Sequence, residues 1–155
     1  MSTIMNMNVL VAEPSGADWA AIAKGIRRQL PEASVLRVKD GEQALRFLFH
    51  RGLFTVEPPV PDLVLLAEEL PLIPAAGVIA RMRIDPRTRL TPVIVVRQDL
   101  EEESLEPYWD GQLRSAMTSI CVTDGLEVQV AEAVHDLCHR YPPLPERQKE
   151  LSFRQ

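Results

Sequence analysis

The segment Asp62-Leu63-Val64-Leu65-Leu66-Ala67 is apolar at every position after the aspartate. A second segment of the same kind, Pro92-Val93-Ile94-Val95-Val96, follows further along the chain. Short, almost continuous apolar runs are typical of strands that are buried on both faces, as in a parallel sheet. The two segments therefore predict the centre of a sheet that other elements cover on both sides.

Outward from this centre, short apolar segments alternate with longer stretches that have helical spacing. Three further strands are predicted at Asn8 to Ala12, Ser34 to Val38 and Thr118 to Val122. Helices are predicted at Ala17 to Leu30, Gly41 to Arg51, Ala75 to Ile84 and Leu126 to His139, with a more weakly patterned one from about Pro107 to Ala116. This alternation predicts an α/β fold, with a five-stranded parallel sheet that is doubly wound in a three-layer α/β/α arrangement. Ligands of such sheets bind beyond the carboxyl ends of the strands.

The length and charge of the chain narrow the classes of function. A chain of 155 residues fits one domain, which we place at residues 8–140, between an N-terminal extension at 1–7 and a proline-containing arm at 141–155. The net charge of -5, without a contiguous run of Lys or Arg, disfavours binding to nucleic acid or to an anionic membrane. No signal-peptide pattern and no membrane-length apolar stretch stands out, so we expect a cytoplasmic protein.

The cysteines and histidines do not form a recognisable metal motif. Neither Cys121 nor Cys138 belongs to a CxxC pair. His135 and His139 are four residues apart, with Cys138 nearby, and a solvated helix surface is the favoured interpretation over a zinc site. No Ser-His-Asp set, catalytic carboxylate pair or phosphate-binding glycine loop is evident. We therefore expect no metal, no cofactor and no enzymatic activity.

Three segments together resemble the receiver domains of response regulators, over about Asn8 to Arg140. They are Lys39-Asp40-Gly41-Glu42-Gln43-Ala44-Leu45, which continues to Phe47-Leu48-Phe49-His50-Arg51-Gly52, then Pro61 to Leu66, and finally Arg83 to Val96. The first, with its Phe-Leu-Phe helix end, is similar to regulators that partner bacterial phytochromes. The resemblance implies the flavodoxin-like receiver fold.

The resemblance also implies a phosphorylation site, whose chemistry needs five groups. Two adjacent acids after the first strand and an Asp after the third hold Mg²⁺, and that Asp accepts the phosphoryl group. A Thr or Ser after the fourth strand and a Lys after the fifth bind the phosphoryl oxygens. The corresponding positions here hold Glu13, Pro14, Ala67, Arg97 and Thr123. A slip of one residue at the last position would place Val122 there, and neither residue is Lys.

Only the first acid of that site is kept, and an alanine methyl group cannot form an acyl phosphate. The acids that follow Ala67 are not expected to replace it, because strand alternation turns Glu68 away and Glu69 starts a loop. The leading hypothesis is an atypical receiver, or pseudo-receiver, in two-component signal transduction. It would act by phosphorylation-independent binding to a sensor histidine kinase, another regulator or itself, with a link to a phytochrome or another sensor kinase. The alternative is a small-molecule or anion sensor in which Arg97 receives a carboxylate or phosphate.

Two structural expectations follow from these residues. Glu13 has lost its acidic neighbour, and we expect Arg97 to pair with it, because a buried carboxylate needs a compensating charge. We also expect a homodimer that uses the fourth and fifth helices or the tail. The candidate interface residues are Tyr108 and Trp109, in a short acidic helix, and Tyr141, Pro142, Pro143 and Leu144, in the stiff arm.

Overall fold

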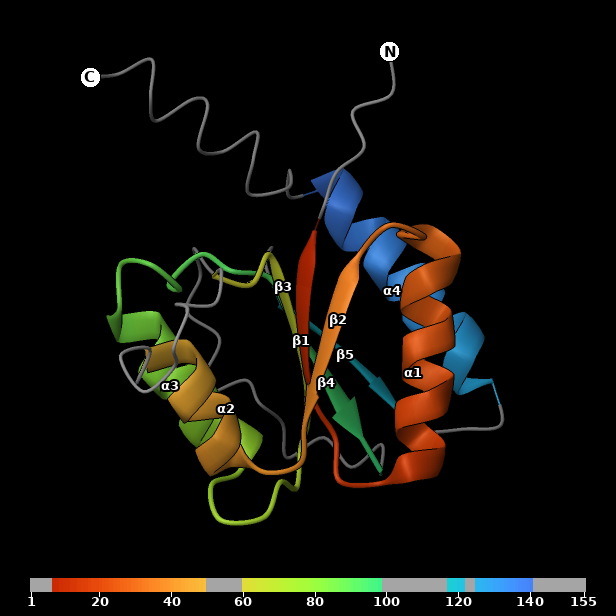
Figure 1. Ribbon diagram of the computed structural model, residues 1–155. Helices are drawn as coiled ribbons and strands as arrows, with labels where there is room; N and C mark the ends of the chain where they lie inside the picture. The colour runs from red at the N-terminus through yellow and green to blue at the C-terminus, as the bar shows by residue number, and fades with distance from the viewer. Residues whose placement is uncertain (1–6, 50–59, 99–116, 122–124, 141–155) are drawn as a thin grey trace, which may run out of the picture.

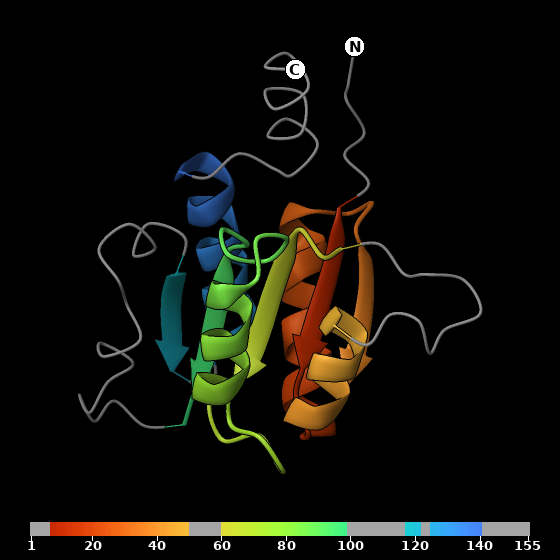
Figure 2. The ribbon, with the colours of Figure 1, turned by 90° about the vertical axis from the view of Figure 1, so that its left-hand side faces the viewer.

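The computed structural model describes residues 7–49, 60–98, 117–121 and 125–140. In chain order, the described elements are β1 (Asn8–Ala12), α1 (Gly16–Gln29), β2 (Ser34–Val38), α2 (Gly41–Phe49), β3 (Leu63–Ala67), α3 (Ala75–Ile84), β4 (Val93–Arg97), β5 (Met117–Cys121) and α4 (Leu126–Arg140). The strands form one parallel sheet in the order β2-β1-β3-β4-β5. Helices α2 and α3 lie on one face of the sheet, and α1 and α4 on the other (Figure 1); in Figure 2, α2 and α3 lie in front of the sheet. The predicted three-layer, flavodoxin-like fold is confirmed.

The middle of the sheet is the most deeply buried part of the structure. Every side chain of β3 is buried. Val64 and Leu66 pack into the apolar cluster under α2 and α3, whereas Leu63 and Leu65 pack into the cluster under α1 and α4. Because both faces of this strand are covered, it has no position for a polar side chain, which explains its continuous apolar run.

The bounds of the elements agree with the predicted ones to within one or two residues. The third predicted strand included Asp62, which the structure places just before β3. Its carboxylate accepts a hydrogen bond from the backbone N–H of Asn8, and its own N–H donates to the Asn8 carbonyl, both at 2.7 Å. The predicted fourth helix, from about Pro107 to Ala116, and the last two residues of the predicted second helix lie outside the described residues.

The turn that leads into α3 packs closely against the start of α2. The N–H of Gly41 donates to the carbonyl of Pro71 at 3.1 Å, and a Cβ atom at Gly41 would overlap the carbonyl of Ile73. Leu72, which lies between Pro71 and Ile73 in this turn, has a φ of 71° and an exposed side chain. This left-handed conformation costs an L-residue about 1 kcal/mol. The turn is therefore held in place by its contact with α2.

Helices α1 and α4 approach each other closely at Gly25. A Cβ atom there would lie 2.5 Å from the backbone carbonyl oxygen of Glu127 and 2.8 Å from the Cβ of Val130. A backbone oxygen cannot move aside as the end of a side chain can. The missing side chain of Gly25 thus allows α4 to cover the sheet at its observed distance. An exposed ion pair between Arg28 and Glu127, at 2.9 Å, borders this contact and contributes little to stability.

We expect Gly25→Ala to destabilise the protein by about 1 to 3 kcal/mol, because the added methyl group forces α1 and α4 apart. The higher helix propensity of alanine offsets only part of this loss. Equilibrium unfolding in urea measures the difference. Gly16→Ala is the matched control, since a Cβ at Gly16 meets nothing within 4 Å. An unfolding midpoint for Gly25→Ala equal to that of Gly16→Ala would contradict the close approach.

Candidate functional site

Charged residues lie at the carboxyl ends of three neighbouring strands of the sheet. Strand β1 is followed by Glu13, β3 by Glu68, and β4 ends at Arg97. The strands are adjacent in the order β1-β3-β4, and all of them end at the lower edge of the sheet in Figure 1. Ligands of doubly wound sheets bind at this edge, so it is the candidate site.

Glu13 is a buried acid with one unpaired oxygen. Its side chain is only 2% exposed. One carboxylate oxygen accepts a hydrogen bond from the N–H of Ser15 at 3.1 Å, while the other has no hydrogen-bond partner among the described residues. Burial raises the pKa of Glu13 above its ordinary value. The bond from Ser15 opposes this rise in pKa, the charge of Asp18 adds to it, and Arg37 opposes it.

Arg37 holds the loop in which Glu13 lies, although sequence analysis had not selected it. Its guanidinium group donates to the main-chain carbonyl of Glu13 at 3.0 Å and to that of Pro14 at 3.1 Å. The same group lies over the ring of Trp19, 5.7 Å from the ring centre. The available signal was an arginine among the apolar residues of the second strand, but nothing in that pattern identified its acceptors.

Arg97 does not pair with Glu13, so that expectation was wrong. Its Nε atom lies 3.0 Å from a carboxylate oxygen of Glu68, and the two side chains are 14% and 28% exposed. The physical reason is the strand register. The N–H of Glu68 donates to the carbonyl of Val96, which places Glu68 beside the end of β4, whereas Glu13 follows β1 on the far side of β3. Arg97 therefore pairs with Glu68, the acid that follows the neighbouring strand.

The position that the resemblance assigns to the phosphoryl acceptor holds an apolar side chain. Ala67 is the last residue of β3, is buried, and belongs to the apolar cluster under α2 and α3. Pro14, in place of the second acid, is exposed, and so is Glu69, as expected. Thr123, the candidate for the lysine position, lies outside the described residues. In the described part of this edge, no carboxylate stands at the acceptor position, and Glu13 is the one buried carboxylate.

The remaining sequence candidates lie elsewhere. The proposed interface residues, which are Tyr108, Trp109, Tyr141, Pro142, Pro143 and Leu144, fall outside the described residues. His135 and His139 are both exposed, with ring centres 4.1 Å apart. Burial raises the pKa of the Cys138 thiol. Across the described ranges, no cluster of three metal-ligating side chains is found, and no helix is long and apolar enough to cross a membrane.

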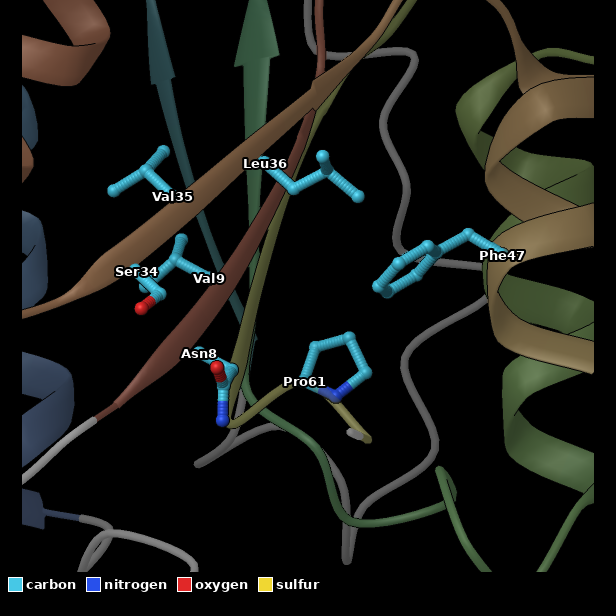
Figure 3. A pocket seen from close by; sticks show the side chains of 7 residues that line it. All are labelled: Asn8, Val9, Ser34, Val35, Leu36, Phe47 and Pro61. Atoms are coloured by element: carbon cyan, nitrogen blue, oxygen red, sulfur yellow. The ribbon is translucent and has the colours of Figure 1, made fainter. Parts of the chain in front are cut away.

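A hollow of about 270 Å³ lies at the opposite end of the sheet, between the starts of β1 and β2 and the side of α2. Leu36 and Phe47 point toward each other across it, whereas Val35 points away (Figure 3). The other lining residues are Asn8, Val9, Ser34 and Pro61. Small-molecule sites usually measure ~300 Å³ or more and have convergent polar groups, and this hollow has few. It therefore does not extend the site at the carboxyl edge.

Comparison with solved structures identifies the fold. The phosphorylated cyanobacterial phytochrome response regulator RcpA is 22% identical, with 85% of this chain and 93% of that chain covered and a TM-score of 0.72. The bacteriophytochrome response regulator RtBRR is 25% identical, with 86% and 78% covered and a TM-score of 0.68. The response regulator RPA3017, in red light signaling of R. palustris, is 23% identical, with 88% and 94% covered and a TM-score of 0.69. No family model matches the chain, and no curated protein matches it by sequence.

The chain is thus a doubly wound α/β protein with the fold of a response-regulator receiver domain. The predicted resemblance is confirmed at the level of the fold, and phytochrome response regulators are among the structures that share it. These matches cover most of both chains. They identify the fold, but they do not show what chemistry the residues at the carboxyl edge perform.

We expect Glu13→Gln to stabilise the protein by about 1 kcal/mol at neutral pH, because it removes a buried charge with an unpaired oxygen. Folding raises the pKa of Glu13, so the ionised form destabilises the folded state at any pH above the folded pKa. This destabilisation disappears as the pH falls through the folded pKa toward the value of a free glutamate. Thermal unfolding of both proteins between neutral and acidic pH should therefore show a difference in Tm that shrinks on acidification.

The control for this experiment is Glu69→Gln, which changes the same charge on an exposed side chain of the neighbouring loop. Its Tm should follow that of the unmodified protein at every pH. A loss of stability in Glu13→Gln at neutral pH would mean that the ionised carboxylate has a partner that compensates its burial.

Proposed function

We propose that this protein is a pseudo-receiver of two-component signalling, which acts in the cytoplasm by binding other proteins without being phosphorylated. The observation that carries the proposal is the buried methyl group of Ala67 at the end of β3, where the resemblance to receiver domains places the phosphoryl acceptor. Around it, the chain has the receiver fold, and buried apolar side chains form a packed cluster on each face of the sheet. A receiver fold whose carboxyl edge holds different residues fits a binding module better than an enzyme.

The charges of the carboxyl edge support this proposal. Arg97 is already neutralised by Glu68, and Glu13 is a lone buried acid, so the described part of the edge lacks a set of carboxylates for a divalent cation. The same ion pair weakens the alternative of an anion sensor. An incoming phosphate or carboxylate would have to compete with Glu68 for the guanidinium group.

The proposed pathway is light-dependent, and it rests on the structural relatives. RPA3017 belongs to red light signaling, and RcpA and RtBRR are phytochrome response regulators. We extend this setting to the present chain, with a sensor histidine kinase, another response regulator or a second copy of the chain as binding partners. Signal output would then pass through contacts of the receiver fold itself.

The first test is incubation with acetyl phosphate and Mg²⁺, followed by intact mass measurement. We expect no acid-labile mass increase, because no carboxylate stands at the acceptor position. Ala67→Asp should also stay unmodified, since Pro14 supplies no second carboxylate for the metal. A stoichiometric adduct on the unmodified protein would overturn the proposal, whereas an adduct on Ala67→Asp alone would show that the rest of the site still works.

The second test concerns self-association, which we expect to be constitutive in the absence of a phosphoryl switch. Sedimentation at micromolar concentration should give about twice the chain mass of 17.4 kDa. Trp109→Ala, and separately truncation after Arg140, should shift the protein toward monomer, because large aromatic residues and stiff segments are favoured at interfaces. A monomer at this concentration would reject the dimer. A dimer unaffected by both changes would reject the proposed surface.

A further inference from the structure

The corner between α3 and β4 is an exposed surface that the proposed function does not yet use. We call Arg81, Ile84, Arg87, Arg89 and Leu90 the arginine corner. It comprises the last turn of α3 and the turn that leads to β4. In Figure 1 this turn lies at the upper edge of the sheet, at the opposite end from Glu13 and Ala67. A partner bound here would not touch the former phosphorylation site.

Two large apolar side chains of the corner are exposed to solvent. Ile84 is 73% exposed and Leu90 is 50% exposed. Single exposed apolar residues are common on protein surfaces, but here two stand within one corner, between arginines. Their aliphatic surface and the adjacent guanidinium groups offer an apolar contact with a charged rim, which is the usual layout of a protein interface.

The corner is positively charged, although the chain is acidic. Residues 81–90 contain four arginines and one aspartate, a net charge of +3, in a chain whose net charge is -5. The one acid, Asp85, is held by Arg87 through contacts of 3.1 and 3.3 Å, which lowers the pKa of Asp85. Arg81 lies over the ring of Phe49. The side chain of Arg89 is exposed and has no ion pair with any residue in the described ranges.

The backbone of the corner is already fixed in one conformation. The N–H groups of Thr88 and Arg89 both donate to the carbonyl of Asp85, at 3.1 and 2.8 Å. The buried hydroxyl of Thr88 donates to the carbonyl of Met82 at 2.8 Å, which closes the end of α3. A surface that is ordered before binding loses little conformational entropy when a partner docks.

A structural role explains only part of this arrangement. Arg81 and Arg83 lie in the last turn of α3, where positive charge stabilises the helix dipole. That reason does not extend to Arg89, which lies beyond the helix, or to the exposure of Ile84 and Leu90. The exposed charge of Arg89, together with the exposed apolar surface, is better suited to binding.

We propose that the arginine corner binds an acidic segment of a partner protein, in which apolar side chains accompany the carboxylates. The carboxylates would pair with Arg81 and Arg89, and an apolar side chain would pack on Ile84 and Leu90. Charge favours a protein segment over an anionic membrane, because the rest of the chain has a net charge of -8, from -5 less +3, and would be repelled by an extended anionic surface. A short segment touches the corner alone. This inference deepens the proposed binding function by naming a surface and the chemistry of its partner.

The test uses a short fluorescein-labelled peptide of glutamate and leucine, and the same peptide with glutamine in place of every glutamate. The full chain should bind the glutamate peptide more tightly in fluorescence anisotropy, and added salt should weaken this binding. Arg89→Glu should lower the affinity about tenfold, because it replaces attraction by repulsion. Arg27→Glu, the same change on an exposed residue of α1, is the matched control and should have little effect.

Other outcomes would overturn the inference. They are equal binding of both peptides, and equal loss of binding in Arg89→Glu and Arg27→Glu. Binding to phosphatidylserine vesicles that Arg89→Glu abolishes, without any binding of the glutamate peptide, would assign the corner to membranes instead. None of these outcomes alters the phosphorylation test, so a failure here can be told apart from a failure of the pseudo-receiver proposal.

Discussion

The burial of β3 between two helical layers is the constraint on which the rest of the structure depends. Its side chains alternate between the two apolar clusters, so one strand ties both helical layers to a common sheet. Because β3 is central, β1 and β4 pair with it on either side, and their ends are fixed relative to its own. The residues that follow these three strands thus reach one edge of the sheet in a set order, which decides the partners of the charged groups there.

This order also shows how much of the site could be predicted. The apolar runs fixed the strands to within a residue or two, since burial on both faces leaves a plain signal. The helices followed from their spacing, whereas the reading of Ala67 as a changed acceptor position rests on the resemblance and stays a prediction. The partner of Arg97 could not be read in the same way. Glu13 and Glu68 both follow strands, and only the strand order places Glu68 beside β4 and Glu13 one strand further away.

The two ends of the sheet differ in how their charges are satisfied. At the carboxyl edge, Arg97 is neutralised within the fold and Glu13 is shielded from solvent. At the opposite edge, the arginine corner leaves positive charge and apolar surface open to solvent. Under the proposed function, signalling would pass through contacts with partners, because the chain would accept no phosphoryl group. The open corner is a surface on which such contacts can form.

The bonds made by Arg37 have a consequence for how this sequence can change. Its guanidinium group binds the loop after β1 by donating to the main-chain carbonyl oxygens of residues 13 and 14. Every amino acid has such a carbonyl. These two bonds therefore do not depend on which side chains stand at positions 13 and 14. A substitution at either position can leave these two contacts between the loop and β2 in place. Pro14, at the position where the resemblance expects a second acid, keeps the carbonyl that Arg37 binds.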